Sequence, residues 1–363
     1  MQAQSYSKRF GISQSMIKDW EKMSPAKWKR TWVEKSEKKK SEDYFDFGSL
    51  VDCLLFTPDL FDDNFIITKI KIPAVAGIVD RIYEMHSEQQ APLKQIGFPV
   101  RPKILNDFHE EILQIAKLPE FNYGKGEYKP ERVIKEIVAK GSEYFDKKCE
   151  VGGKIIITTE DNIIAMDRVD VLRKDPRSRP YFVEQEGETL LFQQEIFVPL
   201  REYSFLPFFA ENDMAEHILY KKGALDIIRI DHIAMTIENP DFKTSYDASK
   251  NNFIRHIKKL KYGIQASYYR RLLEHWAAEN YPGYRLLPPF NIAIDRIVKA
   301  PMFYRYDTSE LSILEKGHPD FHGREVSGWQ QSLDEITWHI ENNVWDNCRE
   351  MTEQGFIDVH LFA

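Results

Sequence analysis

The sequence is poor in cysteine and contains no long apolar run. Its three cysteines, Cys53, Cys149 and Cys348, lie far apart and show no Cys-x-x-Cys spacing. This excludes a disulfide framework and a cysteine-bound zinc site, and it favours a reducing cytoplasm. No stretch approaches the roughly 18 to 20 apolar residues that span a bilayer, so no membrane association is expected. The opening residues also lack the apolar core and cleavage site of a secretory signal.

Basic residues are distributed unevenly along a chain whose overall charge is acidic. The 363 residues include 50 Lys and Arg against 57 Asp and Glu, a formal charge of −7, with 42% hydrophobic residues. This composition is typical of globular proteins and excludes a disordered or fibrous chain. Lys and Arg gather in residues 18–40, among Trp20, Trp28 and Trp32, and again in residues 250–271. One such run alone favours a solvated helix face, but two local basic surfaces suit phosphate binding whatever the net charge.

The hydrophobic pattern predicts an α/β protein. Residues 1–150 read as a mostly helical part with basic, Trp-rich helices. One over 10–35 is expected to begin near Ser13 or Ser15 as its cap and to restart at Ser24-Pro25. Residues 151–363 read as the core, either as a second domain or as part of one continuous domain. Short β-branched segments after residue 180 predict strands, and residues 251–281 predict one long amphipathic helix. We expect a mixed central sheet flanked by helices, with helical elaborations at both ends of the chain.

The segment GALDIIRIDHIAMTIENPDFKT carries the residues most suited to chemistry. Asp226 lies in one predicted strand, Asp241 at the end of the next, and Lys243 two residues later. Strand side chains alternate between faces, so Asp241 and Lys243 point one way and Phe242 the other. Two carboxylates and an ammonium group then converge, with the Phe242 carbonyl as a further oxygen ligand. Such hard oxygen ligands suit Mg²⁺, and Lys243 could position or help deprotonate an attacking water, or steady charge on a phosphate.

An Asp-x-Lys triplet alone carries little information, because it occurs by chance about once in a chain of this length. The following helix adds weight, since it places Gln265 and Tyr269 four residues apart on one face, with Tyr262 beside them. There an amide and a phenol could hydrogen-bond to a phosphate or to the two carboxylates. A P-loop, a GxSxG elbow and an HExxH motif are all absent, which leaves this segment as the candidate site.

Together these residues resemble the PD-(D/E)xK nuclease superfamily and its RecB-like branch, which carries a QxxxY motif. The resemblance rests on Asp226, on the run from Pro240 to Thr244, and on Gln265 to Tyr269. KKGALDIIRID, DFKTSYDAS and KYGIQASYYRRLL are further similar to motifs of RecE-type exonucleases (exonuclease VIII). Matching segments near both ends extend the similarity from about residue 12 to 350. Asp52 and Asp175 stand where relatives carry histidine.

The resemblance implies a restriction-endonuclease-like fold and a metal-dependent nuclease. It implies a 5′→3′ exonuclease on ends of double-stranded DNA, which works in phage-type recombination with a single-strand annealing protein. It also implies a ring-like trimer or tetramer, encoded by a phage or prophage and located in the bacterial cytoplasm. Mg²⁺ would be the cofactor, with Mn²⁺ as a substitute. An upstream acid should complete the metal site: Glu195 is the first choice and Glu188 the alternative.

The predicted catalytic residues are thus Asp226, Asp241, Lys243, Gln265, Tyr269 and Glu195, and the predicted metal ligands are Asp226, Asp241, Glu195 and the Phe242 carbonyl. The residues predicted to contact DNA are Lys258, Lys259, Lys261, Tyr262, Arg270, Lys27, Lys29 and Arg30. Two other functions stay open: a catalytically silent DNA-binding or scaffold protein of the same fold, and a structure-specific endonuclease.

Overall fold

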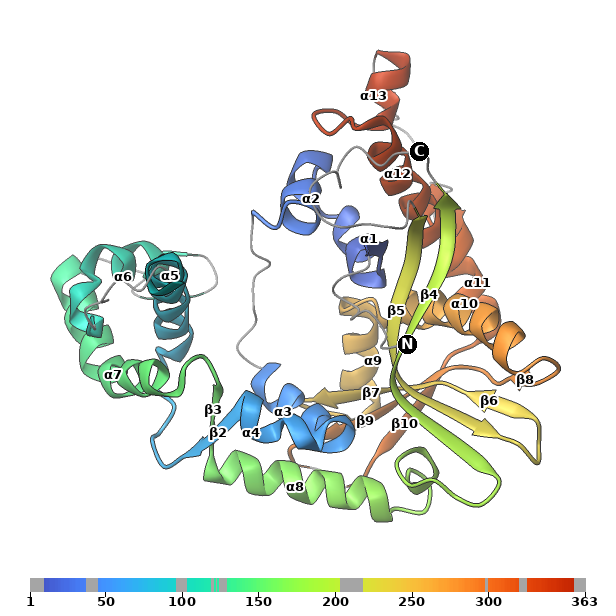
Figure 1. The fold of residues 1–363 in the computed structure, drawn as a ribbon, viewed down its shortest axis with the longest axis horizontal. Coiled ribbons are helices and arrows are strands. Elements are labelled where there is room, and N and C mark those ends of the chain that lie inside the picture. The colour runs from blue at the N-terminus through green and yellow to red at the C-terminus, as the bar shows by residue number, and fades with distance from the viewer. Residues whose placement is uncertain are drawn as a thin grey trace. The chain divides into compact units, whose positions relative to one another are not determined.

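A computed structural model describes most of the chain and divides it into two compact units. The described residues are 10–36, 45–95, 103–118, 121, 123, 129–202, 218–297, 300–319 and 325–355. One unit comprises Met1–Ser41 and Asp170–Ala363, and the other comprises Glu42–Val169 (Figure 1). The units do not follow the sequence-based boundary at residue 150, because the first helices of the chain pack with its C-terminal part. The expected mixed α/β class is confirmed. Over the described residues, no helix is both long and apolar enough to cross a membrane.

The Glu42–Val169 unit is mostly helical. Its elements are α3 (Phe45–Phe56), a 3₁₀ turn (Pro58–Leu60), α4 (Phe61–Asn64), β2 (Phe65–Thr68), α5 (Ala76–Gln95), a second 3₁₀ turn (Leu105–Asp107), α6 (His109–Ala116), α7 (Pro130–Val151), β3 (Ile155–Thr158) and most of α8 (Thr159–Lys174). Strands β2 and β3 pair in parallel. Apolar side chains of α5, α6 and α7 form one core, and Gly141 allows close helix packing, since a Cβ there would lie 2.7 Å from a methyl of Val79.

Among its described residues, the larger unit contains a five-stranded sheet, a three-stranded sheet and the two-stranded β11–β12 pair, where a single central sheet was expected. Its elements before the candidate site are β1 (Gly11–Ile12), α1 (Gln14–Trp20), α2 (Pro25–Trp32), a 3₁₀ turn (Arg179–Tyr181), β4 (Glu188–Glu202), β5 (Ile218–Asp231), β6 (Thr236–Glu238) and β7 (Pro240–Ser245). After it come α9 (Lys250–Lys259), α10 (Tyr262–Asn280), β8 (Arg285–Leu286), β9 (Phe290–Asp295), β10 (Met302–Arg305), α11 (Thr308–Lys316), β11 (Gly317–Pro319), β12 (Glu325–Ser327), α12 (Trp329–Asn342) and α13 (Arg349–Gln354). Strand β5 is central in the first sheet: β4 and β6 pair with it antiparallel and β1 in parallel, and β8 pairs with β6. The second sheet has the order β10–β9–β7, with β7 and β9 parallel.

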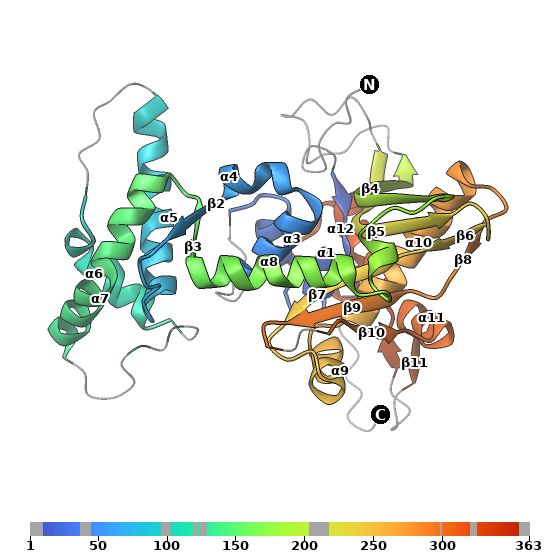
Figure 2. The same ribbon diagram turned by 90° about the horizontal axis from the view of Figure 1, so that it is seen from below.

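Residues 251–281 form two helices, so the expected single long helix is wrong. Helix α9 ends at Lys259 and α10 begins at Tyr262, with Lys261 between them in the left-handed region at φ 53°. The apolar stripe predicted for one helix serves two separate clusters. Phe253 of α9 packs with Ala293 beside the β7–β9–β10 sheet (Figures 1 and 2). Tyr268 of α10 packs in the main core beneath β4 and β5.

Two predicted helix starts are confirmed by the hydrogen bonds that cap them. Ser13 caps α1 by accepting from the Met16 amide, and Ser24 caps α2, where Pro25 occupies the first position. Proline suits that position because its missing N–H would have no partner in the helix. These helices pack against the end of the chain: the Trp28 indole donates to the Met16 carbonyl at 2.9 Å and stacks on Trp345 at 5.9 Å.

His339 of α12 is fully buried in this aromatic cluster, 5.1 Å from the Trp20 ring and 5.5 Å from Trp345. Its Nδ1 donates to the Val344 carbonyl, and its Nε2 has no hydrogen-bond partner among the described residues. Burial lowers the pKa of His339, with a smaller contribution from Arg349. The folded state therefore favours the neutral ring, and protonation would create a buried N–H without an acceptor.

We expect this histidine to make the protein sensitive to acid. Because the pKa is lowered in the folded state, its contribution to stability is fully present above the unfolded value of about 6.5 and is lost as pH falls below it. Urea unfolding at pH 7.5 and 5.5 measures the loss. His339→Gln cannot titrate, so it should flatten this part of the pH dependence while lowering stability at pH 7.5. An unchanged difference between the two pH values in the variant would contradict the prediction.

Candidate active site

The two predicted carboxylates are brought together by contact between β5 and β7. The Phe242 amide of β7 donates to Asp226 Oδ2 of β5 at 3.0 Å, so the Asp226 carboxylate lies at the Asp241–Phe242 peptide. Asp241 is the second residue of β7, whereas the sequence placed it at a strand end. Alternation along β7 holds as predicted. Lys243 Nζ lies 2.6 Å from Asp241 Oδ2, while Phe242 packs edge-on against Phe182.

The Asp241 carboxylate is buried and accepts hydrogen bonds from three elements. Gln265 Nε2 of α10 donates to its Oδ1 at 2.8 Å. Asn291 Nδ2 of β9 donates to its Oδ2 at 2.9 Å, and Lys243 pairs with the same oxygen. Because a buried carboxylate without donors is very costly, these partners make burial at this position possible. The predicted proximity of Gln265 to Asp241 is confirmed.

Lys243 is enclosed by the two carboxylates and one aromatic ring. Its side chain is 18% exposed, and its ammonium lies 5.2 Å from the centre of the Tyr262 ring. Burial lowers the pKa of Lys243, but the attraction of Asp241 and then of Asp226 outweighs burial and raises it above the ordinary value. Ammonium over an aromatic face adds a favourable cation–π contact. Tyr262 thus lies next to the predicted lysine.

Asn291 and Tyr306 belong to this cluster and were missed in the sequence. Asn291 faces Asp241 directly in the parallel pairing of β7 with β9, and the Tyr306 hydroxyl donates to Asn291 Oδ1. Burial, and then the Asp241 charge, raise the pKa of the Tyr306 phenol. The sequence held one indication of the role of Asn291, because it is a polar residue in the otherwise apolar strand FNIAI. Its partner, however, lies fifty positions earlier in the chain.

Tyr269 lies one turn after Gln265 on α10 and is a core residue. Its ring lies against Gly223 of β5, where a Cβ would be 2.9 Å from the ring. It belongs to the main hydrophobic cluster. An α-helix rises about 6 Å over four residues, so Tyr269 sits one turn from the Gln265–Asp241 contact. Its predicted catalytic role remains a prediction.

The predicted third acid is not assembled with the first two. Glu195 of β4 pairs with Ala224, and its charge acts on Lys222. Gln193 stands opposite Asp226 instead and donates to its Oδ1 at 3.5 Å. Among the described residues, no three His, Cys, Asp or Glu side chains form a metal-binding group. The metal role of Glu195 stays a prediction.

Glu188, the alternative third acid, belongs to a separate ionic cluster. It pairs with Asp231, five residues after Asp226 on β5, which is about 16 Å along a strand. Both of its carboxylate oxygens accept from Arg229, one of them at 3.1 Å. Arg229 also pairs with Glu238. Asp175 is likewise engaged locally and accepts from the Arg177 amide at 2.8 Å.

Asp226 and Asp241 nevertheless suit a magnesium ion held by two carboxylates. A carboxylate has about four acceptor positions; Asp241 uses three of them, and the described partners of Asp226 include two donors. Mg²⁺ takes one or two protein carboxylates and keeps several waters. The donor chemistry thus fits this ion without Glu195. The Phe242 carbonyl remains a predicted ligand.

The two basic segments of the sequence meet at the junction of α9 and α10. Lys18 Nζ of α1 donates to the Leu260 carbonyl at 3.4 Å, and Lys261 forms an ion pair with Glu21. Lys258 and Lys259 are exposed in the last turn of α9. This junction is one residue from Tyr262 and hence borders Lys243. Most of the predicted DNA contacts near the site therefore share one surface.

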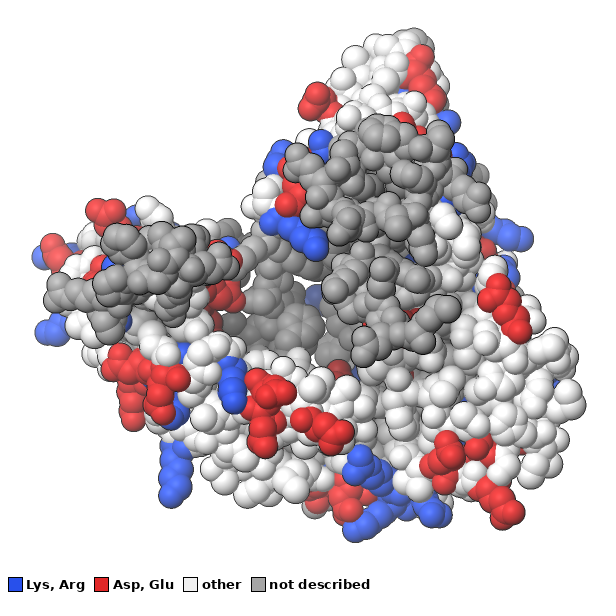
Figure 3. Space-filling model, viewed as in Figure 1, with Lys and Arg blue, Asp and Glu red and all other residues white. Residues whose placement is uncertain are grey.

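The other predicted DNA contacts lie elsewhere or are already engaged. On α2, Lys27 and Arg30 are exposed, and Lys29 pairs with Glu34 at 3.3 Å; Figure 3 shows this basic group over α2 beside acidic side chains. Arg270 pairs with Glu274 at 3.1 Å. These two ion pairs weaken the case for Lys29 and Arg270 as phosphate ligands.

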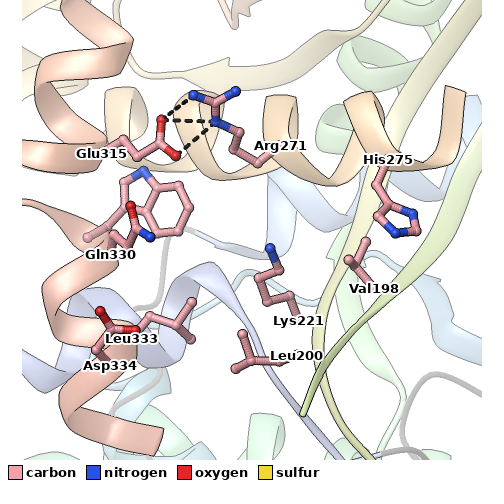
Figure 4. A pocket seen from close by; sticks show the side chains of 10 residues that line it. Val198, Leu200, Lys221, Arg271, His275, Glu315, Gln330, Leu333 and Asp334 are labelled. Carbon is pink, nitrogen blue, oxygen red and sulfur yellow. Dashed lines mark hydrogen bonds and ion pairs between the residues drawn. The ribbon is translucent and has the colours of Figure 1, made fainter. Parts of the chain in front are cut away.

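A separate pocket of about 170 Å³ lies between β4, β5, α10 and α12 (Figure 4). Its charged lining includes Lys221 and the ion pair of Arg271 with Glu315, whose closest approach is 2.7 Å. Burial lowers the pKa of Lys221. None of the predicted catalytic residues lines this pocket, so the candidate site is the polar cluster around Asp241.

Comparison with known proteins gives no further guide to this cluster. The chain matches no protein-family model and no curated protein. A functional assignment therefore depends on the geometry of the site itself.

We expect Asn291→Ala to destabilise the protein, because it removes a buried donor from Asp241 and an acceptor from Tyr306. The free energy of unfolding should fall by about 1–3 kcal/mol, the usual cost of an unsatisfied buried polar group. Urea denaturation at neutral pH measures the change. Gln193→Ala is the matched control: Gln193 is exposed and its contact to Asp226 is long, so its effect should stay within about 0.5 kcal/mol. Equal effects of the two substitutions would contradict this account of the cluster.

Proposed function

We propose that this protein is a Mg²⁺-dependent deoxyribonuclease that acts as a 5′→3′ exonuclease on linear double-stranded DNA. The observation that carries the proposal is the cluster of Asp226, Asp241, Lys243 and Gln265. It joins two carboxylates, an ammonium group and an amide from three elements. Resemblance of the same residues to PD-(D/E)xK nucleases suggested the assignment, and a restriction-endonuclease-like arrangement of the core is part of the proposal.

Each residue of the cluster has a role in this mechanism. Asp226 and Asp241 would hold Mg²⁺, which when bound polarises a phosphate and lowers the pKa of a water ligand; Mn²⁺ would substitute. Lys243 would position the attacking water and steady the charge that develops on the phosphate. Gln265 holds the Asp241 carboxylate in place, and the Tyr262 ring faces the Lys243 ammonium. Pre-positioned groups of this kind need little rearrangement during the reaction.

The basic junction of α9 and α10 supports a polyanionic substrate. Lys258 and Lys259 are exposed there, and Tyr262 connects this surface to Lys243. Contacts of lysine with phosphates position a nucleic acid without reading its sequence. This suits an enzyme that degrades DNA progressively from an end. As part of the same proposal, the protein would act in phage-type recombination in the bacterial cytoplasm, with a single-strand annealing protein and as a ring-like trimer or tetramer.

A second candidate is a catalytically silent nucleic-acid-binding protein with the same cluster. Two observations favour it: Asp241 is engaged by three donors, and no third acid joins Asp226 and Asp241 among the described residues. A cluster built only for stability would have the same donors. A structure-specific endonuclease is a third possibility with the same residues. The experiment below separates the three.

We expect the protein to release nucleotides from linear duplex DNA with Mg²⁺ and to leave a covalently closed circle intact, because an exonuclease needs an end. Lys243→Met keeps the side-chain stem but removes the ammonium, so kcat should fall by about 100-fold or more, as for loss of one charge-stabilising group. Duplex affinity should change little. Steady-state hydrolysis of an end-labelled duplex gives kcat and KM separately.

Lys316→Met is the control, because Lys316 is exposed at the end of α11 in the same unit. Circular dichroism and urea unfolding show whether Lys243→Met still folds. Duplex binding without nucleotide release by the wild type would favour the silent protein, and cleavage of the closed circle would favour the endonuclease. Normal turnover with weakened binding in Lys243→Met would make this lysine a phosphate clamp.

Lys258→Ala and Lys259→Ala should each weaken binding to duplexes of any sequence. Each lost phosphate contact should also reduce the slope of log K against log salt by about 0.9. Binding titrations between 50 and 200 mM salt, in Ca²⁺ to prevent hydrolysis, measure this slope. The control Lys316→Ala should leave the slope unchanged. Equal slopes for all three variants would place the DNA on another surface.

A further inference from the structure

The pocket between the five-stranded sheet and the helices α10, α11 and α12 is separate from the Asp241 cluster (Figure 4). All of its lining side chains belong to the larger unit. Its volume is about 170 Å³, whereas pockets that hold drug-sized ligands begin at roughly 300 Å³. A compact molecule therefore fits this space better than a nucleotide does.

The walls formed by β4 and α12 are largely apolar. Val198 and Leu200 line the pocket from β4. Leu200 is the extra residue of a β-bulge, because the pairing of β4 with β5 shifts around it, and such bulges turn a side chain out of the regular alternation. Trp329 and Leu333, one turn apart, line the pocket from α12. These four side chains would contact an apolar part of a ligand.

Lys221 of β5 extends from the sheet into this pocket (Figure 4). Strand alternation sets its direction. Gly223, two residues later, lies on the face that α10 covers, since a Cβ there would be 2.9 Å from the Tyr269 ring, and Lys221 faces the same way. Among the described residues, its ammonium forms no ion pair or hydrogen bond. Burial lowers the pKa of Lys221, and the attraction of Glu315 opposes this only in part.

The guanidinium and carboxylate groups beside Lys221 neutralise one another. Both carboxylate oxygens of Glu315 accept from Arg271 Nε, at 2.8 and 2.9 Å. Glu274 accepts from Arg271 Nη1 at 2.6 Å and from Arg270 Nε at 3.1 Å. Two guanidinium groups thus face two carboxylates, and the charge of Lys221 remains without a counter-ion.

Two further titratable residues of the lining, Asp334 and His275, are exposed. The charge of Asp334 acts on Arg349, and His275 Nδ1 lies 3.4 Å from Glu279 Oε1. Neither forms an ion pair with Lys221 in the part of the chain that the structure describes. A half-buried ammonium without a partner costs stability. Such departures from well-paired packing are expected where a protein binds a ligand.

We propose that this pocket binds a small organic acid, whose carboxylate pairs with the Lys221 ammonium and whose apolar body lies against the walls from β4 and α12. The inference is independent of the proposed nuclease function. A carboxylate supplies the missing counter-ion through a charge-assisted hydrogen bond, which is about twice as strong as a neutral one. Inorganic phosphate would satisfy Lys221 but leave the apolar walls in contact with water, so an organic acid is the better fit.

A fluorine NMR titration tests the pocket, with para-fluorobenzoate as the probe and para-fluorobenzamide as its neutral analogue. The wild type should bind the acid more tightly than the amide. Lys221→Met keeps the apolar stem and should weaken binding of the acid about tenfold or more, the effect of losing one charged hydrogen bond, while the affinity for the amide stays unchanged. Equal affinities of the wild type for acid and amide would overturn the proposal without any variant, as would an unchanged affinity for the acid in Lys221→Met.

Lys222→Met is the matched control. Lys222 is the next residue of β5 and points to the opposite face, where a Cβ on Gly11 would lie 3.2 Å from its stem. Burial lowers the pKa of Lys222 to about 8, so the control also replaces a half-buried lysine, and it should bind the acid as the wild type does. In urea unfolding, Lys221→Met should be at least as stable as the wild type, because an unpaired ammonium is removed. A clear loss of stability would assign Lys221 a structural role instead, and equal affinities for phosphate and para-fluorobenzoate would overturn the assignment to an organic acid.

Discussion

The buried Asp241 carboxylate is the constraint on which the arrangement of the candidate site depends. Burying a carboxylate is tolerated only where donors replace its water, and here the donors come from β7, β9 and α10. Lys243 supplies the opposite charge, while Gln265 and Asn291 supply neutral N–H groups. One side chain thereby couples the pairing of two strands to the position of a helix. A substitution at any of these three donors should therefore alter the hydrogen bonding of the Asp241 carboxylate.

The break between α9 and α10 also positions residues of the candidate site. In a continuous helix, Phe253 and Tyr268 would lie along one axis, but in the structure they pack in different hydrophobic clusters. The left-handed residue Lys261 allows the chain to turn between them. This turn sets Tyr262 under the Lys243 ammonium and presents the lysines of α9 at the edge of the cluster. Hydrophobic packing thus places the basic groups that the proposed function requires.

Charged residues near the site divide into separate networks. Glu188 and Glu238 are bound to Arg229, and Asp295 caps backbone amides at the strand end. Asp226 and Asp241 are the carboxylates that meet at Lys243. Over the described ranges, no third His, Cys, Asp or Glu forms a metal-binding group with these two carboxylates, and two carboxylates match the preference of Mg²⁺ for few protein ligands and several waters.

The local periodicity of strands and helices was readable in the sequence, and it correctly indicated which residues of the candidate site lie on the same side of an element. Alternation along a strand put Asp241 and Lys243 on one side, and helical spacing put Gln265 on the face that reaches them. The helix caps at Ser13 and Ser24 follow the same local rules. What the tertiary structure alone decided is pairing between distant segments: Gln193 rather than Glu195 stands opposite Asp226, and Asn291 lies beside Asp241. Strand register and the break at Lys261 come from long-range packing of side chains, a property that no local sequence period records.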